Sequence, residues 1–197
     1  MDIPFYAVRH GISVCLRRSQ PGFSLVEIMI VLAIVSILGI TALPSLQTMV
    51  HRNRVASEVN HFLSQLHLAR SEAIKQGTRI VICQSPDAQT CARTSGWEQG
   101  WIIFKDNNLN RQHDDGELLL RTDRALSSTI RISTGASLHS RRTIVYQATG
   151  LAPGSTATFT FCSPGAPDLA RAIILSNTGR PRLSATRADG STIKCSV

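Results

Sequence analysis

A long apolar run near the start of the chain constrains the fold more than any other feature. Residues 23–43 are 21 positions whose only ionisable side chain is Glu27. As an α-helix rising about 1.5 Å per residue, this run would match the thickness of a bilayer's hydrocarbon core. Three arginines and one carboxylate precede it: Arg9, Arg17, Arg18 and Asp2. The positive-inside rule therefore predicts a single-pass protein whose residues 1–22 stay in the cytoplasm.

A secretory signal peptide is the simplest alternative, since it also has a basic front and an apolar middle. Such a signal carries its small-residue cleavage site behind the apolar segment, whereas Gly22 stands in front of it. The order of basic leader, Gly22, Phe23, Glu27 and long apolar helix resembles the class III signal of type IV pilins and type II secretion pseudopilins. In that family a membrane prepilin peptidase cuts after the glycine and methylates the new amino terminus. The resemblance implies cleavage after Gly22 and methylation of Phe23.

Glu27 is unusual because a carboxylate inside hydrocarbon costs about 2.5–3.5 kcal/mol on insertion scales and persists where it finds a partner. In pilins the corresponding glutamate is thought to meet the free amino terminus of a neighbouring subunit during filament assembly. The resemblance implies the same role for Glu27. The alternative is a side chain that reaches the membrane interface without any partner.

The remaining chain predicts an α+β head. Residues 45–76 keep a helical period with an apolar stripe, and Gly77 supplies a stop. Short β-rich runs follow, and they predict antiparallel strands: Thr78–Cys83, Gly100–Lys105, Glu117–Arg121, Ile130–Thr134, Thr143–Tyr146, Thr156–Phe161, Arg171–Leu175, Arg182–Thr186 and Thr192–Val197. The predicted parts are a leader (1–22), a transmembrane or filament-core helix (23–43), its amphipathic continuation (44–76) and a globular head (77–197).

Sequence motifs in the predicted head resemble one particular branch of the pilin family. The run Gly96-Trp97-Glu98-Gln99-Gly100-Trp101-Ile102-Ile103-Phe104, followed by an Asn/Asp-rich loop and Gly116-Glu117, resembles the FimT/GspH branch of minor pilins and pseudopilins. This resemblance implies the pilin fold, in which a long N-terminal helix packs on an antiparallel sheet. Trp97, Trp101 and Phe104 are expected first of all as core aromatics.

Four cysteines remain after removal of a leader that contains Cys15. They are Cys83, Cys91, Cys162 and Cys195. In an oxidising periplasm an even number predicts two disulfides, although sequence allows three pairings. We favour Cys83–Cys91, which closes a short loop, and Cys162–Cys195, which ties down the last strand. A zinc site is the alternative, but the spacings do not match common zinc sites.

Charge is unevenly distributed. The formal net charge is +8, and residues 124–197 carry nine arginines or lysines against two aspartates. This basic half predicts an anionic partner, with nucleic acid, lipid headgroups and acidic polysaccharide as candidates.

The segment Asn177-Thr178-Gly179-Arg180-Pro181-Arg182 gives the strongest functional signal. Gly179 permits a turn, and Pro181 restricts the backbone that follows it. The guanidinium groups of arginine can bind phosphate oxygens in pairs. In the competence-associated FimT proteins a Gly-Arg-x-Arg motif is the DNA-binding element, and Gly179, Arg180 and Arg182 match it. Weaker candidates for the same surface are Arg187, Lys194, Arg171, Arg141 and Arg142. The alternative is a solvated hairpin turn.

Other sites have weaker support. Residues 106–117 place oxygen-bearing side chains as in an EF-hand loop, but Arg111 stands where an EF-hand needs glycine and the flanks are predicted strands. We therefore expect a hairpin loop and no metal or other cofactor. The histidines are scattered, and no nucleophile with its base, paired catalytic carboxylates or phosphate-binding glycine loop is present, so we expect no enzyme.

Two functions follow from these patterns. The first is a minor type IV pilin of the bacterial inner membrane, with its head in the periplasm, that binds extracellular DNA for natural transformation through backbone phosphates. Its partners would be prepilin peptidase, other pilin subunits in a filament and DNA. The second is a structural or assembly-priming pseudopilin of a type II secretion system or pilus that does not bind DNA.

Overall fold

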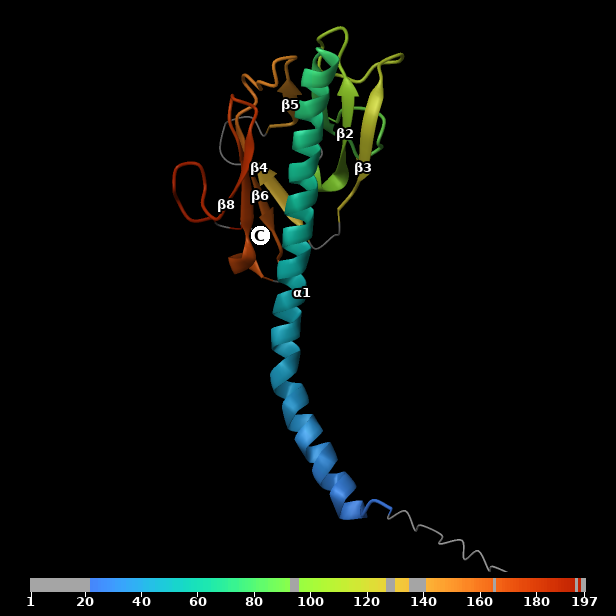
Figure 1. Cartoon of the computed structure of the whole chain (residues 1–197), viewed down its shortest axis with the longest axis vertical. Coiled ribbons are helices and arrows are strands. Elements are labelled where there is room, and N and C mark those ends of the chain that lie inside the picture. The colour runs from blue at the N-terminus through green and yellow to red at the C-terminus, as the bar shows by residue number, and fades with distance from the viewer. Residues whose placement is uncertain are drawn as a thin grey trace, which may run out of the picture. The chain divides into compact units, whose positions relative to one another are not determined.

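The computed structural model describes residues 22–92, 96–126, 130–134, 141–164, 166–193 and 195, with the side chains of residues 40–45 also outside the description. The chain divides into two compact units, Met1–Leu43 and Pro44–Val197. One helix, α1 (Leu25–Gln76), begins in the first unit and ends in the second (Figure 1).

In the first unit the described residues form the beginning of α1. The backbone carbonyl of Ser24 accepts hydrogen bonds from the N–H groups of Glu27 and Ile28, which starts the helix. Its apolar side chains are exposed, with Phe23 79% and Leu25 77% accessible. In the described part of the chain, no helix is long and apolar enough to cross a membrane. The span predicted over residues 23–43 includes residues 40–43, whose side chains lie outside the description.

The second unit contains eight described strands in two antiparallel sheets. The first sheet has the order β3-β2-β1-β5, with β1 (Ile80–Gln84), β2 (Gly100–Lys105), β3 (Leu119–Arg124) and β5 (Thr143–Tyr146). The second has the order β4-β6-β7-β8, with β4 (Arg131–Thr134), β6 (Ala157–Cys162), β7 (Arg171–Leu175) and β8 (Pro181–Ser184). Two single-turn helices, η1 (Trp97–Gln99) and η2 (Pro167–Leu169), lie in the connections.

The C-terminal half of α1 packs on both sheets and completes one core (Figure 1). Its buried stripe consists of Val55, Val59, Phe62, Leu66, Ala69 and Ala73. The helical period predicted all of these except Val55, but it also placed Leu46 and Val50 in the stripe, and both are exposed. Phe62 lies at the centre, with its ring 5.0 Å from Trp101 in the first sheet and 5.0 Å from Phe159 in the second. The helix ends where Gly77 adopts a left-handed φ of 61°. The predicted fold class, a long helix packed on antiparallel sheet, is confirmed.

The two central strands of the first sheet, β1 and β2, are buried on both faces, which explains why they show little alternation in the sequence. Ile82 and Ile103 are paired and face the helix, whereas Val81 and Phe104 are paired on the opposite face. That opposite face holds a second apolar cluster, which includes the Cys83–Cys91 disulfide. The side chain of His113 covers Phe104, with ring centroids 5.2 Å apart.

Both favoured disulfides, Cys83–Cys91 and Cys162–Cys195, are present. The strand predicted at Thr192–Val197 is wrong for its described residues, of which only Thr192 makes a β-bridge, to Thr186. The chain there turns back tightly at residues 187–191 and is tied by Cys195 to β6, so no ladder extends along it. Strand β3 begins at Leu119 and not at the predicted Glu117. The Glu117 carboxylate instead accepts hydrogen bonds within the preceding loop.

Candidate nucleic-acid interface

The predicted Gly-Arg-x-Arg segment forms the turn between β7 and β8, and Gly179 is fixed there by close packing. Gly179 is buried and has a left-handed φ of 72°. A Cβ at this position would overlap the Gly150 carbonyl and lie 3.2 Å from the Tyr146 ring. Only glycine fits this backbone and this space. The turn is closed by a 2.9 Å hydrogen bond from the Gly179 N–H to the Ser176 carbonyl.

Asn177 joins this turn to the connection between β5 and β6. Its carbonyl accepts a 2.9 Å hydrogen bond from the Ala152 N–H. Its side-chain oxygen accepts bonds from the Gly154 N–H at 3.1 Å and from the Thr156 hydroxyl at 2.8 Å. The helix contributes too, since Arg70 Nε donates to the Gly150 carbonyl at 3.0 Å. The turn is thus anchored to the first sheet and to α1.

Arg180 and Arg182 lie on this anchored turn with exposed side chains, on either side of the buried Pro181. Neither forms an ion pair with a carboxylate of the described residues. Arg182 pairs with Ile174 of β7, so it lies on the sheet face that points away from the helix. Two uncompensated guanidinium groups are therefore displayed on a rigid support.

Arg171 does not join this surface. It pairs with Phe161 of the helix-facing core, so its side chain leaves the sheet on the face opposite to that of Arg182. There it lines a cavity of about 400 Å³ together with Ala56 and Leu183. The register therefore puts Arg171 and Arg182 on opposite faces of the sheet, and a DNA-binding role of Arg171 stays a prediction.

Arg187 and Lys194 belong to the C-terminal tail. Arg187 is half-buried, and its N–H donates to the Ser191 carbonyl at 2.9 Å. Ser191 also donates to the Asp189 carboxylate from its hydroxyl and its N–H, and these bonds lower the pKa of Asp189. The Asp189 carboxylate therefore lies close to Arg187 and partly neutralises its charge, so Arg187 is a weaker candidate for a phosphate contact. Lys194 lies outside the described residues.

The predicted processing and assembly residues lie at the described start of the first unit. Gly22 and Phe23 precede the helix, and Glu27 lies in its first turn with an exposed side chain. A carboxylate in the first turn interacts favourably with the helix dipole. These positions are accessible to a peptidase or to a neighbouring subunit.

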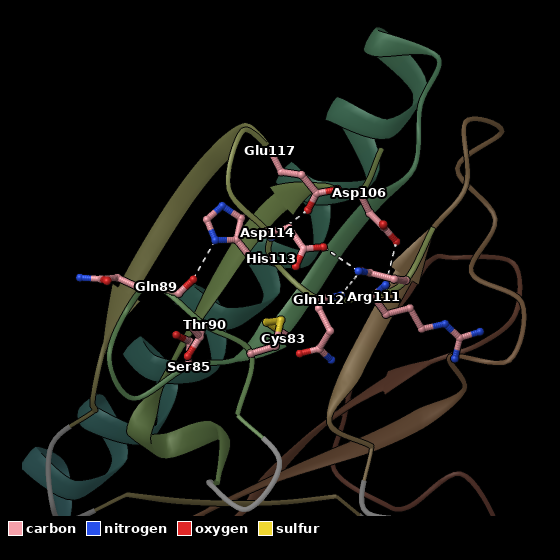
Figure 2. The surroundings of a disulfide bond; sticks show 12 residues. Cys83, Ser85, Gln89, Thr90, Asp106, Arg111, Gln112, His113, Asp114 and Glu117 are labelled. Carbon is pink, nitrogen blue, oxygen red and sulfur yellow. Dashed lines mark hydrogen bonds between the residues drawn. A yellow bond between two sulfur atoms is a disulfide. The ribbon is translucent and has the colours of Figure 1, made fainter. Parts of the chain in front are cut away.

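Two carboxylates of the loop at residues 106–117, those of Asp114 and Glu117, accept hydrogen bonds within the loop. Asp114 accepts hydrogen bonds from the side-chain amides of Asn108 at 2.8 Å and Asn110 at 2.6 Å, which lower the pKa of Asp114. Glu117 accepts bonds from the N–H groups of residues 107 and 114. Figure 2 shows this loop beside the disulfide of Cys83. Across the described residues, no group of three or more His, Cys, Asp or Glu side chains could hold a metal ion.

Two of the histidines singled out in the sequence make contacts between the helix and the sheets. His61 Nε2 lies 2.9 Å from Asp123 Oδ1 on β3, and its ring lies against Trp101. His51 Nδ1 lies 3.1 Å from the Ser163 hydroxyl, just after β6. These contacts give both side chains a packing role.

Comparison with known proteins decides the family. The model described as type II transport protein GspH matches residues 58–179, which is more than half of the chain. The chain belongs to the GspH family. The prokaryotic N-terminal methylation motif also matches, over residues 17–43, and it includes the predicted processing site at Gly22. The GspH match spans α1 from Glu58, the strands β1 to β7 and the turn as far as Gly179, so β8 with Arg182 lies beyond it.

Relatives of the GspH-family chain are pilins. Two fimbrial proteins of Pseudomonas aeruginosa are each 39% identical over 69 residues, which are 35% of this chain and 44% of theirs, so the chain spans less than half their length. The pilin-like protein PilA1 of Thermus thermophilus is 29% identical over 170 residues, 84% of this chain and 99% of that protein.

Solved structures show the same fold. Two crystal forms of the type IV minor pilin FimU of Pseudomonas aeruginosa superpose with TM-scores of 0.53 and 0.50, at 24% and 23% identity. They cover 68% and 66% of this chain and 90% and 91% of FimU.

Proposed function

We propose that this chain is a minor subunit of a type IV pilus, acts as a filament component and not as an enzyme, and binds extracellular DNA through the Gly179–Arg182 turn. Cleavage after Gly22 would free Phe23 for methylation, and Glu27 would meet the amino terminus of a neighbouring subunit. The methylation motif and the exposed apolar side chains at the start of α1 support this processing and assembly. The subunit would be held in the bacterial inner membrane, with its head in the periplasm, before it enters the filament.

One observation carries the DNA-binding part of the proposal. Arg180 and Arg182 project from a turn that Gly179 and Asn177 fix to the first sheet and the helix, and no described carboxylate pairs with them. A solvated hairpin turn does not need such an anchor. A rigid pair of guanidinium groups loses little entropy when it binds phosphate oxygens.

The bound chemistry would be the phosphate backbone. Arg180 precedes β8 and Arg182 lies on it, and the proposed contact joins their guanidinium groups to phosphate oxygens, so contact to base edges is not expected. DNA of unrelated sequence should therefore bind with similar affinity. Such binding serves uptake of any extracellular DNA in natural transformation, as in the FimT proteins that this chain resembles.

The proposal is tested by titrating fluorescent duplexes of two unrelated sequences with the full chain in nonionic detergent. The test variant is Arg180→Gln/Arg182→Gln. The matched control is Arg121→Gln/Arg124→Gln, which removes the same charge from β3 in the first sheet. We expect weaker binding of both duplexes by the test variant alone. Equal binding by the test variant and wild type, or no binding by either at low salt, would contradict the proposal.

A second function has its own support, namely a pseudopilin of a type II secretion system that does not bind DNA. The matching family model is described as a type II transport protein. The packing of Gly179 on Gly150 also accounts for that glycine without any ligand. The same titration separates the two functions, because a structural pseudopilin predicts no DNA binding by the wild type.

A further inference from the structure

A basic cavity lies next to the Gly179–Arg182 turn. Its volume is about 590 Å³, and three separate segments line it with arginines, namely Arg79 just before β1, Arg111 in the 106–117 loop and Arg141 just before β5. None of its lining residues is acidic. Convergence of three guanidinium groups on one concave site is typical of anion binding.

Only one of these three charges is neutralised. Arg79 is mostly buried and forms an ion pair with the fully buried Asp106, with 3.2 Å between Nε and Oδ2. Arg79 Nη1 also donates to the Leu109 carbonyl at 3.3 Å. Arg111 and Arg141 form no ion pair with any carboxylate in the described ranges. The cavity therefore keeps about two uncompensated positive charges.

The backbone conformation of Arg111 is held by a hydrogen bond within its loop. Its φ is 65°, a left-handed conformation that is unfavourable for a residue with a Cβ. The Arg111 N–H donates to Asp106 Oδ2 at 3.3 Å, which holds this conformation. Figure 2 shows the Arg111 side chain directed away from Asp114 and Glu117. Asp114 and Glu117 thus accept hydrogen bonds within the loop, while the guanidinium of Arg111 lines the cavity.

Arg141 connects the cavity to the turn. Its Nη2 donates to the Thr156 carbonyl at 3.3 Å, and its own carbonyl accepts a 2.7 Å bond from Trp97 Nε1. The Thr156 hydroxyl in turn donates to the side chain of Asn177, two residues before Gly179. Gly154, which lines the cavity, donates to the same Asn177 oxygen. A single hydrogen-bonded framework therefore holds both the cavity and the turn.

We propose that the Arg79–Arg111–Arg141 cavity binds a phosphate group, and that this group is a backbone phosphate of DNA held at the neighbouring turn. The identity of the phosphate as part of DNA rests on the proposed function. Binding of phosphate itself does not, since it follows from the charge and shape of the cavity. Two uncompensated guanidinium groups more than offset the single negative charge of a backbone phosphate and can bind its oxygens in pairs.

The test uses the full chain in nonionic detergent with the variant Arg111→Gln/Arg141→Gln. The control is again Arg121→Gln/Arg124→Gln on β3, at the edge of the same sheet opposite β5. Tryptophan fluorescence checks that each variant is folded. If the double variant does not fold, the single variant Arg111→Gln replaces it, because the side chain of Arg111 is exposed.

Two measurements are made on each protein. Inorganic phosphate is titrated while the arginine Nε–H signals are followed by NMR, and duplex DNA is titrated at several salt concentrations. We expect phosphate to shift the signals of Arg111 and Arg141 in wild type and control. We expect the cavity variant to bind DNA about tenfold more weakly at low salt, with a salt slope smaller by about 0.9, because one phosphate contact is lost.

The outcomes separate the two proposals. If wild type binds DNA and the cavity variant binds it equally well, the cavity proposal is wrong while the proposed function stands. If wild type binds no DNA but phosphate still shifts Arg111 and Arg141, the proposed function fails and the cavity remains a phosphate site. If phosphate shifts neither signal and the variant does not weaken DNA binding, the cavity proposal is overturned.

Discussion

Replacement of Gly179 by alanine tests whether the basic turn is anchored as described. Alanine would have to adopt a φ of 72°, and its Cβ would overlap the Gly150 carbonyl oxygen. Gly154→Ala is a matched control, since Gly154 has a φ of 69° but no atom within 4 Å of its added Cβ. The control carries only the cost of the backbone conformation, whereas Gly179→Ala carries that cost and a backbone clash.

The expected losses in free energy of unfolding follow from the cost of the backbone conformation and the cost of the clash. The left-handed conformation costs an alanine about 1 kcal/mol, which is the expected loss for Gly154→Ala. Overpacking against a backbone adds about 2 kcal/mol, so Gly179→Ala should lose about 3 kcal/mol in free energy of unfolding. Gly150 cannot move away freely, because its carbonyl accepts a hydrogen bond from Arg70 and its N–H donates to the Gln147 carbonyl.

Urea unfolding of the full chain in nonionic detergent, followed by tryptophan fluorescence, measures both variants. Trp97 and Trp101 are buried in the core of the second unit, so the signal reports on the head. Equal losses for Gly179→Ala and Gly154→Ala would refute the packing of the turn on Gly150. The expected result would also mean that Gly179 acts in the Gly-Arg-x-Arg motif by positioning Arg180 and not by contacting DNA.

Two further predictions concern the stability of the head. Removing Cys162–Cys195, which closes 33 residues, should cost about 3.5 kcal/mol, and removing Cys83–Cys91, which closes 8, about 2.5 kcal/mol. Urea unfolding of the paired serine variants gives the order, and the reverse order would contradict the loop-entropy argument. Hydrogen bonds from Thr90 lower the pKa of Asp87 well below its usual value of 3.8, so Asp87 stabilises the head above that pH and its contribution is lost as pH falls below it. The thermal midpoint of Asp87→Asn should therefore fall less than that of wild type between pH 5 and pH 2, and parallel curves would contradict this role.

The sequence predicts the architecture well where its local signals are strong. The helical period places the buried stripe of α1 from Val59 to Ala73, although it also predicted burial of Leu46 and Val50, which are exposed, and Gly77 marks the end of the helix. The cysteines are paired as predicted, because a short loop and a C-terminal tail are the simplest closures for four thiols. The division of the strands into two sheets has no such local signal, since it depends on which strand edges meet in space.

The candidate site was predictable only in part. Gly179, Arg180 and Arg182 stand out because glycine, proline and closely spaced arginines leave a pattern in the sequence. Arg171 and Arg182 lie on opposite faces of one sheet. This placement depends on the register of the strands, which the sequence does not show. The cavity combines Arg79, Arg111 and Arg141, which are at least 30 positions apart in sequence. One local signal did exist, since Arg111 occupies the position where an EF-hand loop carries glycine. Only the folded chain shows where the side chain of Arg111 points.

The salt dependence of DNA binding by the full chain tests the central claim most directly. The observed affinity of wild type and of Arg180→Gln/Arg182→Gln for one duplex is measured across a range of salt concentrations, and its logarithm is plotted against the logarithm of the salt concentration. If both arginines contact phosphates, the slope for the variant should be smaller by about 1.8. Identical slopes and affinities for the two proteins would contradict the claim that this turn binds DNA.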